Sequence, residues 1–264
     1  MNKKRNLKVV CFTSLENYSS TVIFPEIGKY NSISLIVIEL PAKKAILKKF
    51  KWLKKYFGIQ YTLTRIISLP FRAVVELFKK NKSAKRDNSI IEICKKNKFN
   101  YIIVDKINSI STKQILLKYD LDIGIICGTG IIKDYIFNIP THGTLNFHSG
   151  IVPKYRGMDT IFWAIHNEDY ENIGLTIHFV DSNIDTGPIV FQHRVKYKPG
   201  NSVDDIYKKC CSEGAELFVK ALEQIKTGKL KIVMQSNDLE SKFYKMATYK
   251  EKLIFEKNQK SKIA

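Results

Sequence analysis

The sequence of 264 residues lacks any run of 18 apolar residues, and this absence excludes a helix that crosses a membrane. Its first residues are charged and contain no apolar stretch typical of a signal peptide. It has five cysteines, an odd number, and no C-x-x-C spacing, so a disulfide framework is not indicated. Cys11, Cys94 and Cys127 lie in apolar segments, where free thiols behave as small hydrophobic groups. We therefore expect a reducing, cytoplasmic setting.

Acidic residues are scarce: 25 Asp and Glu stand against 44 Lys and Arg, which gives a formal charge of +19. The excess is local, because residues 1–5, 41–86 and 241–264 together carry +21 and the remainder carries −2. Residues 41–86 contain 14 basic residues and a single acid, Glu76. A nearly neutral body gives no electrostatic reason to expect a nucleic acid as the substrate.

Short apolar segments alternate with amphipathic ones along most of the chain. This alternation predicts an open, mostly parallel, Rossmann-like α/β sheet with helices on both faces. The expected strands are residues 7–12, 33–39, 101–105, 122–128 and 143–148, then a later pair, 173–180 and 188–195. The expected helices are residues 88–98, 112–119, 131–137 and 203–226. We expect the sheet to belong to a domain of residues 1–235, with a basic helical insertion at about 41–86 and a basic extension at 236–264.

Polar residues gather where expected strands end, which is where open α/β sheets place their sites. Asn146 and His148 close one strand and share a face, since side chains alternate along a strand. An amide can stabilise a developing oxyanion and an imidazole can move a proton near neutral pH, so the pair suits acyl-type transfer. The alternative is a capping asparagine and a structural histidine.

The segment from Asn146 to Gly157 reads N-x-H-x-x-x-x-P-x-Y-R-G, and D-T-G follows at residues 185–187. In this order the elements resemble the formyltransferases that use N10-formyltetrahydrofolate, over roughly residues 88–232. That family includes glycinamide ribonucleotide, methionyl-tRNA and nucleotide-linked amino-sugar formyltransferases. The resemblance implies N10-formyltetrahydrofolate as co-substrate and no metal.

The resemblance also implies roles for individual residues. Asn146, His148 and Asp185 match the family's catalytic residues, with Asn146 holding the formyl oxygen, His148 stabilising it or taking the amine proton, and Asp185 tuning His148. The expected pterin-binding residues are Gly128, Thr129, Gly130 and Ile131 in one loop, and Val180, Asp181 and Ile184 in another. For the two glycines, turn geometry alone is an equal alternative.

Arg156, Gly157 and Trp163 are the expected acceptor-binding residues. Arg156 could instead pin its loop, and Trp163 could be a core residue. Four other histidines, His142, His166, His178 and His193, have no partners evident in the sequence, and we assign them no catalytic role.

The acceptor is inferred from departures from the family pattern. The run F-W-A-I at residues 162–165 is similar to sugar-directed members, and the first strand ends without the glycine-rich turn of the purine enzyme. Only about 30 residues follow Lys231, too few for the further domain of the tRNA enzyme. We expect a nucleotide-linked amino-deoxysugar as acceptor, in surface polysaccharide (O-antigen) synthesis. The alternatives are formylation of methionyl-tRNA or another amine, and a binding module without turnover. Sugar-directed relatives are often dimers, so a homodimer is a further expectation.

Residues 43–57 place Ile46, Phe50, Leu53 and Phe57 on one face among seven lysines, which predicts an amphipathic basic helix. Its apolar face could pack on the body while its lysines are solvated. It could also contact an anionic membrane surface, bind nucleic acid or dock a second subunit.

Overall fold

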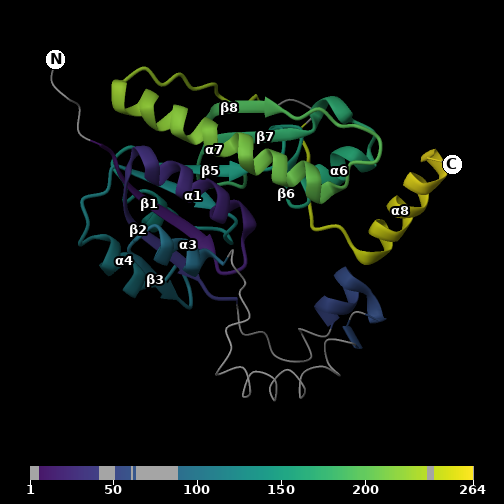
Figure 1. Ribbon diagram of the computed structural model, residues 1–264, viewed down its shortest axis with the longest axis horizontal. Helices are drawn as coiled ribbons and strands as arrows, with labels where there is room; N and C mark the ends of the chain where they lie inside the picture. Colours follow the sequence, from purple (N-terminus) through teal and green to yellow (C-terminus); the bar gives the residue numbers. More distant parts are fainter. Residues whose placement is uncertain (1–5, 42–50, 61, 64–88, 237–240, 264) are drawn as a thin grey trace. The chain divides into compact units, whose positions relative to one another are not determined.

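The computed structural model describes residues 6–41, 51–60, 62–63, 89–236 and 241–263 (Figure 1). The chain divides into two compact units, one built from residues 1–41 and 88–244 and the other from residues 42–87 and 245–264. The expected domain boundary at residue 235 therefore falls inside the first unit.

The first unit is built on a seven-stranded sheet with the order β3-β2-β1-β4-β5-β7-β8. Its parallel part consists of β1 (Lys8–Ser14), β2 (Ser32–Glu39), β3 (Tyr101–Val104), β4 (Ile123–Cys127) and β5 (Thr144–His148). The last two strands, β7 (Gly174–Phe179) and β8 (Ile189–Arg194), are antiparallel. The predicted fold class is confirmed, including the later strand pair.

Helices cover both faces of this sheet (Figure 1). Helices α1 (Tyr18–Tyr30), α3 (Ile90–Lys96) and α7 (Val203–Thr227) pack on one face. Helices α4 (Ile110–Leu116) and α5 (Asp134–Phe137) close an apolar cluster on the other face, together with Val10 and Phe12 of β1. A short helix, α6 (Thr160–His166), and a 3₁₀ turn, η2 (Tyr170–Asn172), precede β7.

Local sequence explains where these helices begin and end. An Asn or Ser side chain caps the first turn of α1, α3, α4 and α7 by accepting a backbone N–H. In α7 the cap is reciprocal, because Asp205 also accepts from the backbone of Ser202. Gly228 ends α7 in the left-handed conformation, with φ of 68°.

A second, two-stranded sheet joins distant parts of the first unit. Strand β6 (Arg156–Gly157) pairs in parallel with β9 (Phe243–Tyr244). Residues 243–244 belong to the segment that the sequence assigned to a C-terminal extension, yet Tyr244 is buried between the rings of Tyr155 and Trp163. The chain that follows β8 therefore returns to the loop after β5.

The second unit is described only in part, and residues 43–50 of the expected amphipathic helix, residues 43–57, lie outside the described residues. Residues 51–60 are helical, with Lys51, Lys54 and Lys55 exposed and Trp52 half-buried. Helix α8 (Tyr249–Ile263) contacts this helix, because the ring of Tyr249 lies against Gly58. Among the described residues, no helix is both long and apolar enough to cross a bilayer.

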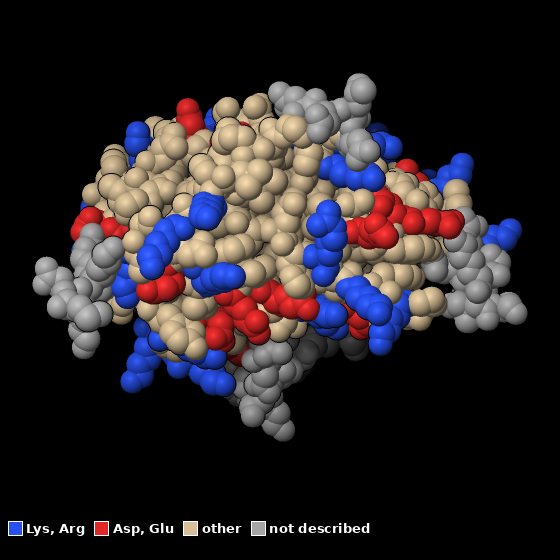
Figure 2. All heavy atoms as spheres, turned by 90° about the horizontal axis from the view of Figure 1, so that it is seen from above, with Lys and Arg blue, Asp and Glu red and all other residues tan. Residues whose placement is uncertain are grey.

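Charges of both signs are intermingled on the face of the molecule shown in Figure 2. On α7, three lysines pair with acids one turn away: Lys208 with Asp204, Lys209 with Glu213 and Lys226 with Glu223. This mixing agrees with the small net charge of the body in the sequence.

Gly214 of α7 gives a test of how closely this helix packs on β5. An added methyl group there would lie 2.6 Å from Cε2 of Phe147, the residue between Asn146 and His148. We expect Gly214→Ala to lower the free energy of unfolding by about 1–3 kcal/mol through overpacking, although alanine is the better helix former. Denaturant unfolding measures the change.

The matched control is Ser212→Ala, which changes an exposed residue of the same helix. It should leave the free energy of unfolding unchanged or slightly raised. Equal stability of the two variants would show that α7 and β5 are not in close contact.

Candidate active site

Four polar side chains from three segments meet beside β5. Asn146 and His148 come from β5, His178 from β7, and Asp185 from the loop between β7 and β8. His178 lies directly opposite Asn146 in the antiparallel pairing of the two strands. The structure thus brings together the three predicted catalytic residues and adds a fourth.

The carboxylate of Asp185 is the centre of this cluster. Its Oδ2 accepts the backbone N–H of Gly157 at 2.8 Å and lies 3.5 Å from Nδ1 of His148. Its Oδ1 lies 3.4 Å from Nδ2 of Asn146 and 3.5 Å from Nε2 of His178. Asp185 adopts a left-handed backbone with φ of 53°, which is uncommon for a residue with a side chain. Such strain persists only where surrounding contacts hold it.

The other ring nitrogen of His148 fixes its tautomer. Nε2 lies 2.7 Å from the carbonyl oxygen of Tyr155, and a carbonyl can only accept, so Nε2 carries the proton. In the neutral ring, Nδ1 is then unprotonated and faces Asp185. Nδ1 can therefore take up a proton, and the carboxylate can stabilise the cation that results.

The same argument applies to His178, which the sequence analysis left without a role. Its Nδ1 lies 2.8 Å from the carbonyl oxygen of Phe179 and must donate, so Nε2 of the neutral ring is an acceptor. Nδ2 of Asn146 lies 3.2 Å from this Nε2 and donates to it. His178 thereby sets the orientation of the Asn146 amide. In the sequence, the only signal for this role was that His178, like Asn146, lies on an expected strand. The register that places the two residues opposite each other became known only from the structure.

The pKa values follow from burial and mutual charge. Burial alone would raise the pKa of Asp185, but His148, His178 and the N–H of Gly157 outweigh it and lower the value to about 2. Burial lowers the pKa of His148 below its ordinary value of 6.5, and the nearby Asp185 only partly opposes this. Near neutral pH the pair is therefore an ionised carboxylate beside a neutral imidazole.

The loop between β7 and β8 brings Asp185 to Asn146 and His148 of β5. Because β7 runs antiparallel to β5, Phe179 at its end is level with Leu145 near the start of β5. The loop then doubles back, with the N–H of Phe179 bonded to the carbonyl oxygen of Pro188. The antiparallel pairing of β7 with β5 is thus what brings the residues after β7 back toward β5.

The loop after β4 contains the first group of predicted pterin-binding residues. Gly128 has a φ of 63°, and a side chain there would collide with Asn17. Its carbonyl oxygen accepts the hydroxyl of Ser14 at 2.7 Å, so the turn alternative explains this glycine. Gly130 and Ile131 are exposed, and Thr129 is half-buried.

In the second loop, Asp181 accepts the hydroxyl of Thr186 at 2.6 Å and the backbone N–H of Asn183 at 3.1 Å. Val180 is half-buried and packs against the apolar cluster beneath α4 and α5, and the side chain of Ile184 is exposed. The hydrogen bonds of Asp181 stabilise the conformation of the loop. A role of these residues in pterin binding stays a prediction.

The predicted acceptor-binding residues also have structural contacts. Nη2 of Arg156 donates to Oε1 of Gln235 at 3.3 Å, and Gly157 donates its N–H to Asp185. A side chain at Gly157 would meet the carbonyl oxygen of Tyr244 at 2.2 Å, so this position needs a glycine. The half-buried ring of Trp163 stacks on Tyr244 at 5.5 Å.

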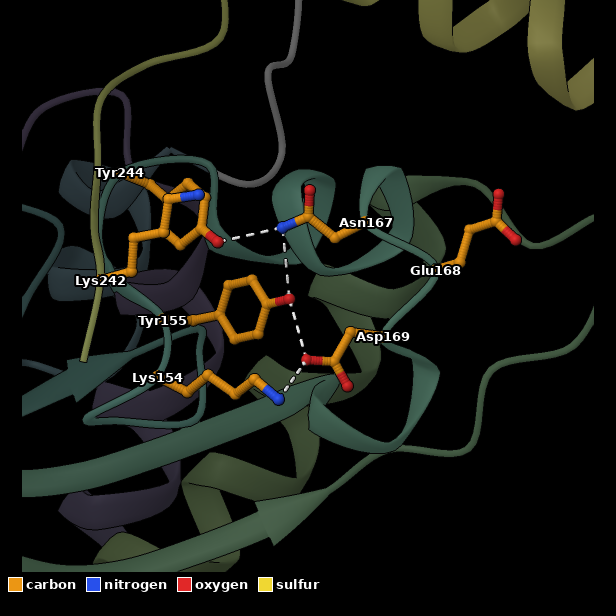
Figure 3. A pocket seen from close by; sticks show the side chains of 7 residues that line it. All are labelled: Lys154, Tyr155, Asn167, Glu168, Asp169, Lys242 and Tyr244. Atoms are coloured by element: carbon orange, nitrogen blue, oxygen red, sulfur yellow. Dashed lines mark hydrogen bonds and ion pairs between the residues drawn. The ribbon is translucent and has the colours of Figure 1, made fainter. Parts of the chain in front are cut away.

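A polar hollow of about 550 Å³ adjoins the residues before Arg156 (Figure 3). Within it, the hydroxyl of Tyr155 donates to Asp169 at 3.0 Å, and Lys154 pairs with the same carboxylate at 3.0 Å. The amide of Asn167 reaches the hydroxyls of Tyr155 and Tyr244. This network anchors the side chain of Tyr155, whose carbonyl oxygen accepts from His148.

The remaining histidines lie outside the cluster: the ring of His166 stacks on Phe162, and His193 pairs with Glu213 at 3.0 Å. In the part of the chain that the structure describes, no group of three or more His, Cys, Asp or Glu side chains is arranged to hold a metal ion.

The sequence pattern of the formyl transferase family, described as "Formyl transferase", matches residues 73–222, more than half of the chain. The chain belongs to the formyl transferase family. The matched range includes Asn146, His148, His178 and Asp185, so the whole cluster lies within it.

Curated relatives include two methionyl-tRNA formyltransferases. That of Methylacidiphilum infernorum is 33% identical over 138 residues, which are 52% of this chain and 43% of the relative. That of Kosmotoga olearia is 32% identical over 140 residues, which are 53% of this chain and 42% of the relative. This formyl transferase chain therefore matches less than half the length of these relatives.

Solved structures with the same fold include glycinamide ribonucleotide transformylase 1 from Symbiobacterium toebii, with a TM-score of 0.60, 14% identity and coverage of 89% of this chain and all of that one. An N-formyltransferase from Helicobacter canadensis has a TM-score of 0.56 and 19% identity, and the match covers 89% of this chain and 70% of that one. A 4-N formyltransferase from Francisella tularensis has a TM-score of 0.54 and 19% identity, and the match covers 91% of this chain and 76% of that one. At these identities the likeness establishes the fold alone.

The electrostatic pairing can be tested without any substrate. We expect the neutral His148 ring to carry its proton on Nε2 and to titrate below pH 6.5. Asp185→Asn should lower the pKa of His148 further, since the carboxylate is what raises it. Nitrogen-15 NMR of the imidazole rings during a pH titration measures both properties.

His193 is an internal control for this titration, because its partner is Glu213 and its signals should be the same in both proteins. A proton on Nδ1 of neutral His148, or a higher pKa in Asp185→Asn, would contradict the assigned geometry.

Proposed function

We propose that this member of the formyl transferase family transfers a formyl group from N10-formyltetrahydrofolate to the amine of a nucleotide-linked amino-deoxysugar. The observation that carries the proposal is the unprotonated Nδ1 of His148, held beside an ionised Asp185 and next to the amide of Asn146. Such a set provides a proton acceptor and an oxyanion donor within one cluster.

N10-formyltetrahydrofolate would supply a formyl carbon that is already electrophilic, and the acceptor amine would replace N10 on it. Nδ2 of Asn146 donates to the formyl oxygen as that atom gains negative charge. The 3.4 Å contact to Asp185 is the longer of the two amide contacts and is the one that this oxygen replaces. Nδ1 of His148 takes the proton that the amine loses on forming the new C–N bond and returns it to the leaving nitrogen. Asp185 stabilises the imidazolium in between.

The loop after β4 and the loop between β7 and β8 contain exposed residues that a folate could contact. Gly130 and Ile131 are exposed, Thr129 is half-buried, and a side chain on Gly130 would meet no atom within 4 Å. Ile184 adds an exposed apolar side chain from the other loop. We propose that Gly128, Thr129, Gly130 and Ile131, with Val180, Asp181 and Ile184, line the pterin pocket.

The amino-sugar acceptor is supported by residues that follow the catalytic strand. Among the described residues, Nε of Arg156 is buried and has no hydrogen-bond partner, which leaves a donor for an anionic acceptor group. The Helicobacter canadensis enzyme with this fold was crystallised with folinic acid and dTDP-3-aminofucose. We propose that Arg156, Gly157 and Trp163 contact the acceptor.

Methionyl-tRNA is the second candidate acceptor, and the curated relatives favour it, since those reported above are methionyl-tRNA formyltransferases. The matched part covers less than half of those enzymes, so it does not account for the rest of their chains. A cytoplasmic location, contact of residues 43–57 with an anionic membrane surface, and a homodimer stay predictions.

The decisive experiment supplies the protein with N10-formyltetrahydrofolate and a panel of dTDP-, UDP- and GDP-linked amino sugars, with methionyl-tRNA in a parallel arm. Release of tetrahydrofolate and the mass of the product report transfer. We expect turnover with at least one amino sugar. Turnover with methionyl-tRNA alone would replace the acceptor, and turnover with neither would refute the proposal.

His148→Ala and Asp185→Ala should lower turnover by at least about 10²-fold while the fold is retained. His193→Ala is the matched control, because His193 pairs with Glu213 away from the cluster, and it should keep the wild-type rate. A wild-type rate in His148→Ala would remove the assigned role.

His178 can be tested with a pair of substitutions. His178→Phe removes the acceptor that orients the Asn146 amide and should lower kcat by up to about 10²-fold, with KM little changed. His178→Gln keeps a side-chain oxygen able to accept from Asn146 and should retain more of the rate. Equal kcat for the two variants, measured by tetrahydrofolate release, would show that orientation of Asn146 does not depend on residue 178.

A further inference from the structure

The segment after α7 returns to the active site. Val233 forms two backbone hydrogen bonds with Ile189, of 2.8 and 2.9 Å, and so runs beside the start of β8. Two residues later, the half-buried Gln235 lies over the turn that contains Asp185, although the two residues are 50 positions apart in the sequence.

Among the described residues, the Gln235 amide makes three polar contacts, and these go to the neighbourhood of Asp185. Nε2 donates to the carbonyl oxygen of Asp185 at 3.0 Å and to that of Gly187 at 2.7 Å. Oε1 accepts from Nη2 of Arg156 at 3.3 Å. One side chain thus uses both its donors on the turn and its acceptor on the neighbouring loop.

The two segments that Gln235 joins are those that hold the catalytic pair. The turn carries the Asp185 carboxylate. The loop of Arg156 supplies the N–H of Gly157 to that carboxylate and the carbonyl oxygen of Tyr155 to His148. Gln235 therefore links the turn that carries Asp185 to the loop whose backbone binds Asp185 and His148.

The backbone of Asp185 needs such a tie. Its φ of 53° is disfavoured for a residue with a β-carbon, by about 1–2 kcal/mol. Without the two hydrogen bonds from Nε2, fewer contacts oppose relaxation of the turn to negative φ, and such a change of φ would move the Asp185 carboxylate away from His148. The contacts to Gly157 and the histidines are then lost together.

We propose that Gln235 is a positioning residue, which holds the Asp185 turn against the Arg156 loop and thereby keeps the carboxylate in place beside His148. The role for catalysis rests on the proposed formyl transfer. The placement of the carboxylate does not depend on it, and the two parts are tested separately.

The test uses Gln235→Met, which keeps the length of the side chain and removes all three hydrogen bonds, and Gln235→Ala, which leaves room for water. Gln114→Met, an exposed change on α4, is the control. The first measurement is the protonation of His148 in the free protein, by nitrogen-15 NMR of its ring. In Gln235→Met the pKa of His148 should fall, because the carboxylate that raises it has moved.

The second measurement is the kinetics of formyl transfer. Both Gln235 variants should lose kcat by about 10–100-fold with KM within about 3-fold, while Gln114→Met matches the wild type. Thermal unfolding accompanies each assay, and if Gln235→Met does not fold, Gln235→Ala carries the same two measurements.

The outcomes separate the two claims. An unchanged His148 titration in folded Gln235 variants overturns the positioning role, whatever the activity of the protein. A shifted titration in a protein that transfers no formyl group supports the placement of the carboxylate and refutes the proposed function instead. Lower thermal stability with unchanged titration and kcat would assign Gln235 a purely structural role.

Discussion

The buried carboxylate of Asp185 is the constraint on which the rest of this structure depends. A buried anion is costly unless hydrogen bonds and nearby positive charge compensate it. Here the N–H of Gly157 and the amide of Asn146 donate to the carboxylate, and His148 and His178 stabilise it further when they are protonated. The segments that carry these groups must therefore converge on one point, and this convergence fixes the relative positions of all the candidate catalytic groups.

The convergence explains parts of the fold that have no other evident purpose. Strand β9 pairs with β6, and Tyr244 stacks between Tyr155 and Trp163, so the chain beyond β8 secures the loop whose backbone faces His148 and Asp185. In this view the formyl transferase core includes residues up to Tyr244. Residues 245–264 belong with residues 42–87 in a unit of their own, which carries much of the positive charge.

The chemistry of the cluster and the choice of acceptor have separate physical bases. Proton uptake by His148 needs only its tautomer and a neighbouring anion, and both are set by backbone carbonyls and the Asp185 turn. Under the proposed function, the acceptor is recognised by residues further from the reacting atoms, and we propose Arg156, whose buried Nε has no hydrogen-bond partner among the described residues, as one of them. This division is consistent with the names of similar proteins, which refer to glycinamide ribonucleotide, methionyl-tRNA and dTDP-3-aminofucose.

The sequence by itself determined the seven strands of the main sheet, helices α3, α4, α5 and α7, and the motifs that contain Asn146, His148 and Asp185. These are local features: apolar periodicity and short motifs. Helix α1 and the short strands β6 and β9 were not predicted. Only the tertiary structure decided that His178 orients Asn146, that Gly157 donates to Asp185, and that Gln235 and Tyr244 support the site. Each of these contacts joins residues far apart in the chain, through an antiparallel register and a two-residue strand too short to leave a periodic signal. Such pairings are fixed by the packing of the whole sheet, which no single segment encodes.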